Sequence, residues 1–173
     1  FGTTANKEYA VACDYISYLG TSKKSAEDIK REFYKLACSF NIIANPRKIA
    51  ILLSGLDENM PKAVKLLNEL MTDAKPDAKA YEQYVALTLK ARQDDKNDQR
   101  KNFNALRRYA MYGPYNQVRN IVSEQELKAL QPQHLVDLFR SLKQYEQSVL
   151  YYGPTRTQQL SACLDKLYEP AKN

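Results

Sequence analysis

The sequence predicts an α+β domain in which several helices pack on a small sheet. Three observations lead to this prediction. Most of the chain carries apolar residues at the three-to-four-residue spacing of amphipathic helices. Two short segments, 39–43 and 48–54, are instead rich in Ile and Leu and are separated by a turn sequence. A third segment of strand composition, 148–152, comes only near the end, so strands and helices do not alternate regularly.

The first two helices are predicted from apolar spacing and from their end signals. We expect the first helix over 6–19, with Tyr9, Ala12 and Ile16 on one face and Gly20 as a left-handed cap at its end. Ser25 follows, with a carboxylate three residues later, which is the pattern of a capping box at the start of a second helix.

A β-hairpin is the economical interpretation of the next segment. The two strand-like runs flank Asn45–Pro46, a typical turn dipeptide. The run Ile49–Leu53 alternates little between apolar and polar residues, which predicts burial on both faces. Three strands make a thin sheet for so many helices, so we also expect a strand that pairs with Ile49–Leu53 to be missing.

Six further helices are predicted in the remainder of the chain. Their expected starts carry capping residues or proline, as helix N-termini commonly do. The polar stretch 93–99 fits a kink, a loop or an exposed part of a helix. The first of these follows Asp57 and the second covers 77–92. The third comes after the polar stretch and carries Phe103, Leu106 and Ala110 as far as Gly113–Pro114. The last three follow Ser123 as far as Leu130, begin at Pro132, and cover 157–167.

Composition indicates one globular domain and excludes several protein classes. The chain has 173 residues, 44% of them hydrophobic, with few glycines and prolines. This composition is not that of a collagen-like or low-complexity chain. No apolar run approaches the roughly 18 residues of a membrane span, and three cysteines are too few for a disulfide framework. We expect 1–173 to be a single domain and read the start without a methionine as a boundary within a larger multidomain chain.

The net charge of +6 raises the question of an acidic partner. The basic residues are spread along the chain, and the densest group lies among aspartates, which is typical of a solvated helix face. We therefore expect no nucleic-acid partner. The alternative function is a helical basic interaction module that binds nucleic acid or an acidic protein.

The segment from Val11 to Thr21 carries a resemblance to a known family. It ends in Tyr-Leu-Gly-Thr and is followed by Ser25–Asp28, the start of the next helix. In order and spacing these elements resemble one domain of the insulinase, or pitrilysin, family of zinc metallopeptidases, the inverted zincins. The resemblance extends to about Leu167 and implies the α+β fold of that family without its first strands. The other segments that carry it are 36–41, 61–70, 126–135 and 149–153.

The zinc-binding motif of that family is degenerate here. An inverted zincin needs His-x-x-Glu-His on one helix face, two imidazoles for the metal and a carboxylate for the water. Alignment on Gly20 places Val11 and Tyr15 at the two ligand positions and Asp14 at the glutamate position. The third ligand of the family would fall near Leu89–Lys90, and neither residue can serve. The only histidine lies far away in the sequence, so we expect no metal and no catalytic residue in this domain.

The resemblance implies a catalytically inactive domain of a zinc metalloendopeptidase. Members of the family contain several such domains, one of which holds the zinc while others enclose the peptide substrate. The expected partners are thus other domains or a separate subunit of the same peptidase, with the peptide contacted indirectly. If the source is bacterial, a periplasmic or cell-envelope location is the expectation.

One further group of residues is a candidate contact site. Arg107, Arg108, Tyr109, Tyr112 and Tyr115 surround a Gly-Pro turn. Tyrosine and arginine are favoured at interfaces, which suggests contact with a partner or a peptide. The simpler interpretation, which we favour, is a helix end that is packed by its own tyrosines.

Overall fold

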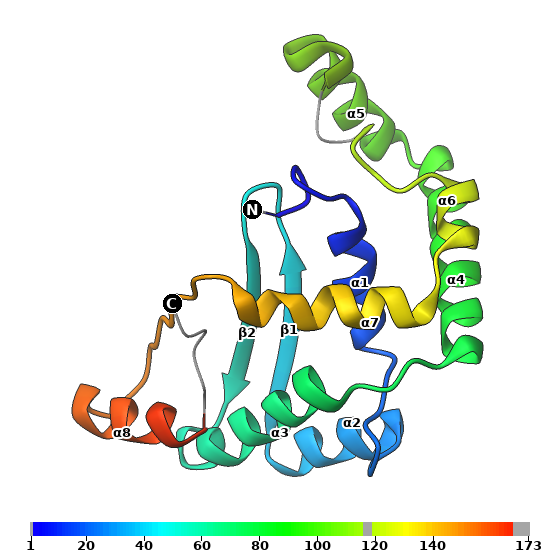
Figure 1. Cartoon of the computed structure of the whole chain (residues 1–173). Coiled ribbons are helices and arrows are strands. Elements are labelled where there is room, and N and C mark those ends of the chain that lie inside the picture. Colours follow the sequence, from blue (N-terminus) through cyan, green and yellow to red (C-terminus); the bar gives the residue numbers. More distant parts are fainter. Residues whose placement is uncertain (1, 116–118, 168–173) are drawn as a thin grey trace.

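Helices come first along the chain, then a hairpin, then helices again. The computed structural model describes residues 2–115 and 119–167, which form eight α-helices and one two-stranded sheet (Figure 1). The α+β class expected from the sequence is confirmed. The elements are α1 (Glu8–Ile16), α2 (Ala26–Lys35), β1 (Cys38–Ala44), β2 (Ile49–Gly55), α3 (Met60–Asp73), α4 (Ala78–Asn97), α5 (Gln99–Tyr112), α6 (Glu124–Ala129), α7 (Pro132–Arg140) and α8 (Thr157–Leu167).

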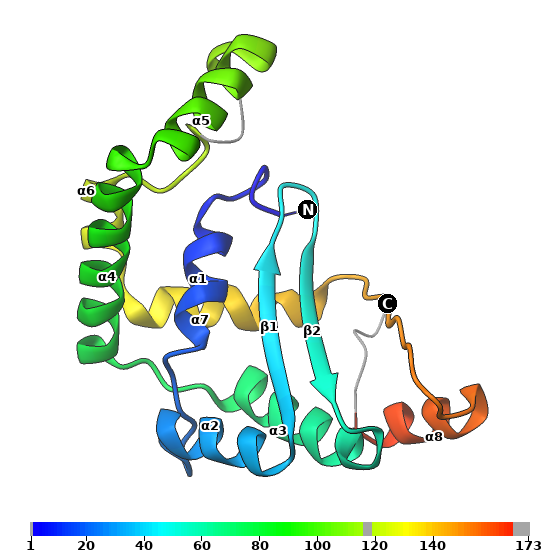
Figure 2. The ribbon, with the colours of Figure 1, turned by 180° about the vertical axis from the view of Figure 1, so that it is seen from behind.

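The hairpin packs one face against the helices. Its strands are antiparallel, with Phe40 opposite Leu53 and Ile42 opposite Ile51, so these four apolar side chains share one face. Seen from behind, in Figure 2, the hairpin lies in front of α7 and beside α1. The expected hairpin and its turn are therefore confirmed, with strand ends that differ by one residue from the prediction.

The expectation that the second strand is buried on both faces was wrong. Leu52 of β2 is on the outward face of the hairpin and is 48% exposed. Ile43, on the same face of the neighbouring strand β1, is 39% exposed. The low alternation of this strand reflects two apolar faces, of which only one is covered by the described residues.

Helix α1 lies at the centre of the core. Six of its residues are buried, and it contacts both α7 and β1. It ends at Ile16, earlier than expected, and Gly20 does not adopt a left-handed conformation. Gly20 is required for a different reason, since a Cβ atom there would lie 2.3 Å from the carbonyl oxygen of Lys24.

The capping boxes that begin at Ser25 and Ser123 are confirmed in the structure. Ser25 accepts a hydrogen bond from the backbone N–H three residues later, and Ser123 forms the same capping box at α6. Glu126 of that box also binds the ammonium of Lys7 at 2.7 Å, which ties α6 to the start of α1. This contact, together with the Ser123 hydrogen bonds, lowers the pKa of Glu126 to about 2.

The third strand predicted over 148–152 does not form. Residues 146–152 are irregular, and Leu150 and Tyr152 are almost fully exposed. The segment is held by side chains instead, because the Asp57 carboxylate accepts hydrogen bonds from the hydroxyls of Tyr151 and Thr155. Asp57 is thus not the cap of α3, which begins at Met60 after a short 3-10 turn.

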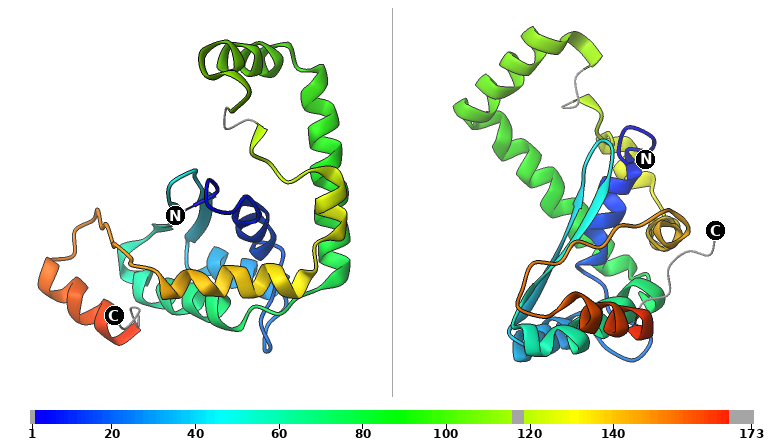
Figure 3. Two further views of the ribbon diagram at one scale, coloured as in Figure 1. Left: turned by 45° about the horizontal axis from the view of Figure 1, so that its top comes forward. Right: turned by 90° about the vertical axis from the view of Figure 1, so that its left-hand side faces the viewer.

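Helices α4 and α5 form an arm that extends from the body of the domain. Figure 3 shows α5 beyond the end of α4, away from the hairpin. The polar stretch 93–97 continues α4, and Asp98 breaks the helix and caps α5 by accepting from the N–H of Lys101 at 3.0 Å. None of the described helices is both long and apolar enough to cross a membrane.

Candidate functional site

The three degenerate motif positions lie on α1, and two of them are part of the core. The side chain of Val11 is 4% exposed and that of Tyr15 is fully buried. Asp14 is on the exposed side of the helix, where its carboxylate faces the hydroxyl of Tyr84 on α4 at 3.5 Å. The structure therefore brings α1 and the first turns of α4 together through aromatic contacts.

Tyr15 is fixed by two hydrogen bonds to the start of α4. Its hydroxyl donates to the carbonyl oxygen of Asp77 at 2.7 Å and accepts from the N–H of the same residue at 3.0 Å. Its ring meets the ring of Tyr81 edge-on, with 5.2 Å between centroids, and that of Tyr84 at 6.3 Å. We call Tyr15, Tyr81 and Tyr84 the tyrosine cluster, which fills the space between α1 and α4.

The electrostatics of this region do not favour acid–base chemistry by the phenols. Burial raises the pKa of Tyr81 to about 12 and also raises the pKa values of Tyr15 and Tyr84. The three side chains are thus neutral donors near pH 7. Burial likewise raises the pKa of the Cys13 thiol to about 12, so a thiolate is not available on α1.

Asp14 is the motif carboxyl nearest to these tyrosines. Although the residue retains solvent-exposed surface, partial desolvation of its carboxyl raises its pKa, and the hydrogen bond from Tyr84 opposes that rise. A general base in a zinc peptidase needs a metal-bound water to deprotonate. Asp14 faces the phenol of Tyr84 and, among the described residues, no imidazole, so it lacks that context.

The expected position of the third ligand is also occupied by other residue types. Leu89 is partly buried against the core, and Lys90 is exposed on α4. His134 is on α7, where its Nε2 atom lies 2.8 Å from a carboxylate oxygen of Glu8. Across residues 2–115 and 119–167, no group of three or more His, Cys, Asp or Glu side chains is arranged to hold a metal ion.

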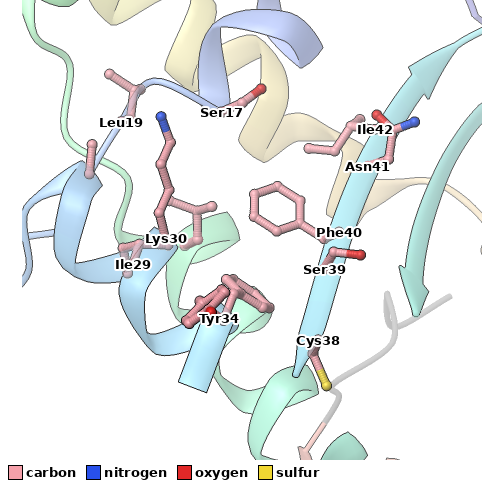
Figure 4. Close-up of a pocket in the computed structure, with 13 residues that line it drawn as sticks. Ser17, Leu19, Ile29, Lys30, Tyr34, Cys38, Ser39, Phe40, Asn41 and Ile42 are labelled. Atoms are coloured by element: carbon pink, nitrogen blue, oxygen red, sulfur yellow. The ribbon is translucent and has the colours of Figure 1, made fainter. Parts of the chain in front are cut away.

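A groove that sequence reasoning did not find lies between α2 and β1. It has a volume of about 310 Å³ and is mostly apolar. Figure 4 shows Phe40 and Ile42 of β1 facing Ile29 of α2 across it, with Lys30 and Tyr34 also at its lining. Only the alternation of apolar residues in β1 could have indicated this groove from sequence.

The outer edge of β1 runs along the same groove. At the hairpin turn, the N–H of Asn45 donates to the carbonyl oxygen of Lys48 at 2.8 Å. Hydrogen-bonded and non-hydrogen-bonded pairs alternate in antiparallel ladders. The backbone groups of Phe40 and Ile42 therefore point away from β2, and no described residue pairs with them.

The predicted contact residues lie on α5, far from the motif positions. Tyr109 is 51% exposed and Tyr112 is 67% exposed, so the helix end is not packed by its own tyrosines as we had favoured. Arg107 and Arg108 have no ion-pair partner within the part of the chain that the structure describes. Tyr115 belongs to a 3-10 turn over 113–115, and its side chain is outside the described atoms. Whether this group contacts a partner stays a prediction.

Comparison with known proteins identifies the family of the chain and a similar fold. Residues 3–125 match the insulinase family, peptidase family M16, and the chain belongs to that family. The fold is similar to that of the periplasmic protease PqqL from Escherichia coli, with a TM-score of 0.67 and 13% sequence identity. The match covers 100% of this chain and 19% of PqqL, so the chain spans about a fifth of that protein. No curated protein sequence matches the chain significantly.

Family membership implies a zinc ion in the catalytic domains of such peptidases. The residues of this chain do not fit that ion at the motif positions. Valine offers no donor atom, the Tyr15 hydroxyl is engaged by the backbone of Asp77, and the ring of Tyr81 lies against it. Zinc in proteins is bound by thiolate, imidazole and carboxylate groups, and the tyrosine cluster supplies none of them.

Proposed function

We propose that this chain is a catalytically inactive domain of a larger zinc metallopeptidase. In this proposal it packs against other peptidase domains and forms part of the wall around the peptide substrate, while zinc and catalysis belong to another domain. The observation that carries the proposal is the tyrosine cluster. Tyr15, at the position that the resemblance aligns with the family's second histidine ligand, is fully buried in this cluster.

The packing of α1 supports a structural role for the degenerate motif helix. Val11, Ala12 and Ile16 are almost completely buried, and the helix joins the hairpin to α7. Such contacts stabilise a fold whether or not a metal is present. A motif helix with this much buried surface can be retained for packing after its ligands are lost.

Two features support the proposal that other protein segments pack against this domain. The β1 edge and the adjoining groove present unpaired backbone groups beside apolar side chains. A two-stranded sheet is only marginally stable alone, and open edges are usually paired or covered. This agrees with the expectation that strands of the same family domain precede the motif helix in a longer protein.

A metal and activity assay tests the proposal directly. The purified chain, dialysed against zinc and then against buffer, should retain far less than one zinc per molecule by elemental analysis. It should also leave a mixture of fluorogenic peptides uncleaved. Stoichiometric zinc, or cleavage that a chelator abolishes and the Asp14→Ala variant lacks, would overturn the proposal.

The alternative function, a basic interaction module, has one specific observation in its favour. Arg107 and Arg108 of α5 have no ion-pair partner among the described residues, so they are available to an anionic partner. Binding to nucleic acid would be lost steeply as salt increases, since each phosphate contact releases counterions. A salt titration of binding to a labelled oligonucleotide, with no detectable complex near physiological salt, would exclude the nucleic-acid form of this alternative.

A further inference from the structure

Helix α5 exposes an unusual amount of apolar surface for a helix of a folded domain. None of its residues is buried. Five large side chains are more than half exposed, and together with Arg107 and Arg108 we call them the α5 patch. They are Phe103 (64%), Leu106 (65%), Tyr109 (51%), Met111 (57%) and Tyr112 (67%).

The size of this patch indicates a contact surface. An aromatic side chain has about 150–250 Å² to bury. At the exposed fractions above, the three aromatic residues alone leave roughly 300 Å² of surface open. Summed around the helix, this area is comparable with the largest apolar patch of a typical monomer, which is about 300–600 Å² and is often functional. The aliphatic side chains of α5 add to this area.

The charge of α5 defines the chemistry of what can cover it. Between Gln99 and Tyr112 the helix has four basic residues and no acidic ones. Lys101 is paired with Asp95, whereas Arg107 and Arg108 are without an ion-pair partner among the described residues. Guanidinium groups bind carboxylates through two parallel hydrogen bonds and are enriched in protein interfaces. An acidic surface with an apolar recess is complementary to this helix.

The distribution of apolar side chains around α5 favours a protein partner over a lipid surface. Phe103 and Leu106 lie on one face, because they are three residues apart. Tyr112 is nine residues from Phe103, or about two and a half turns, and so projects from the opposite side. A helix at a membrane surface buries one face only, whereas a protein recess can enclose both sides.

Two other occupants fit the patch less well. A second copy of the chain would bring like charges together, because a symmetric contact places the same patch on both sides. Nucleic acid would pair with the arginines but leave Leu106 and Met111 uncovered. The charge and the apolar area are both satisfied only by an acidic protein surface.

We propose that α5 docks into an acidic, apolar recess on another domain of the full-length peptidase. Phe103 and Leu106 enter the recess, and Arg107 and Arg108 bind carboxylates at its rim. The identity of the partner as a peptidase domain rests on the function proposed above. The similarity of the chain to a fifth of PqqL is consistent with further domains that could carry this recess.

Cysteine labelling in the full-length protein tests this inference without removing an anchor. Ala110→Cys places the reporter on the face of Leu106, one turn further along, and Gln83→Cys places a control on an exposed part of α4. The rates of maleimide modification are read by peptide mass spectrometry. We expect Ala110→Cys to react at least about tenfold more slowly than Gln83→Cys, although both positions are exposed in the isolated domain.

Charge reversal provides the matched second measurement. In the Ala110→Cys background, Arg107→Glu with Arg108→Glu should restore fast labelling, whereas Lys79→Glu with Lys90→Glu on α4 should not. If the first pair disturbs folding, a rise in salt from about 0.05 to about 0.5 M should accelerate labelling of the unmodified reporter.

Several outcomes would overturn the inference. Equal labelling rates at the reporter and the control show that α5 is open in the full-length protein. Protection that depends on protein concentration indicates a second copy, and protection that requires anionic phospholipid vesicles or DNA indicates those partners instead. Zinc binding or peptide cleavage by this domain would refute the proposed inactive role but would leave the labelling result unchanged, so the two failures are distinguishable.

Discussion

Removal of the Tyr15 hydroxyl should destabilise the domain by a measurable amount. The hydroxyl forms two hydrogen bonds to the backbone of Asp77, and these bonds join α1 to the first turn of α4. A net contribution of about 0.5–1.5 kcal/mol is typical of each hydrogen bond. Because Asp77 is at an exposed helix start, water can replace part of the loss. We therefore expect Tyr15→Phe to lower the free energy of unfolding by about 1–2 kcal/mol.

Removal of the whole side chain extends the same test to the packing of the site. The ring is fully buried against Tyr81 and Tyr84. Deletion of a buried aromatic ring leaves a cavity and costs about 3–5 kcal/mol. Tyr15→Ala should therefore be much more destabilising than Tyr15→Phe. Tyr34→Phe is the control, because Tyr34 is 85% exposed and its change should cost less than about 0.5 kcal/mol.

Urea denaturation followed by far-ultraviolet circular dichroism measures these differences. Thermal unfolding gives a second readout, at about 2–4 °C per kcal/mol for a domain of this size. If Tyr15→Phe matches Tyr34→Phe, the hydroxyl does not tie α4 to α1. If Tyr15→Ala costs less than about 2 kcal/mol, the position is not tightly packed, and the argument that tyrosines fill the metal position fails.

Three further predictions concern thiols, acid stability and turns. Native-state alkylation should modify Cys163 at least about a hundredfold faster than Cys13, whose buried thiol has its pKa raised to about 12; comparable rates by mass spectrometry would contradict the burial of α1. Glu126→Gln should lower the melting temperature at pH 7. The ionised Glu126 carboxylate has a pKa of about 2 in the folded state and 4.5 in the unfolded state, so its ionisation stabilises the folded protein at pH values above about 4.5. That difference should disappear as the pH falls from about 4.5 to about 2, and a pH-independent difference would refute the assignment. Gly20→Ala should destabilise the domain by about 2 kcal/mol or more through its clash. Ala37→Gly, at φ 49°, should stabilise it by about 1 kcal/mol in the same denaturation assay.

The local signals in the sequence predicted helix starts well. Ser25 and Ser123 each have a carboxylate three residues later, and both form the expected capping boxes. The last helix has the predicted bounds, 157–167. These features depend on interactions within a few residues, which a single sequence contains in full.

Features that depend on distant contacts were predicted less well. The 148–152 segment has strand composition, but a strand needs a partner edge, and the side chains of Tyr151 and Thr155 are instead held by Asp57. These partners are more than 90 residues apart, so the contact has no signature in the local sequence. The role of Gly20 depends on a nearer contact, with the backbone of Lys24, but that contact requires the shape of the folded turn.

The candidate site shows the same division. The loss of zinc ligands at Val11 and Tyr15 could be read from residue types alone. That Tyr15 is held by Asp77 and two tyrosines of α4 requires the two helices to be placed side by side. The groove beside β1 is likewise made by two elements that meet only in the folded chain.

The break at Asp98 separates two regions of very different local stability. Beyond it, α5 has no buried residue, so its opening exposes little additional apolar surface. Amide hydrogens of α5 should therefore exchange through local opening at a free energy well below that of global unfolding, while those of α1 exchange only with the whole domain. When α5 docks, it loses conformational entropy, and this loss reduces the net free energy of binding. The contact is therefore weaker and more readily reversible than the buried area alone suggests. Helix α5 is thus suited to an association that forms and dissociates while the core remains folded.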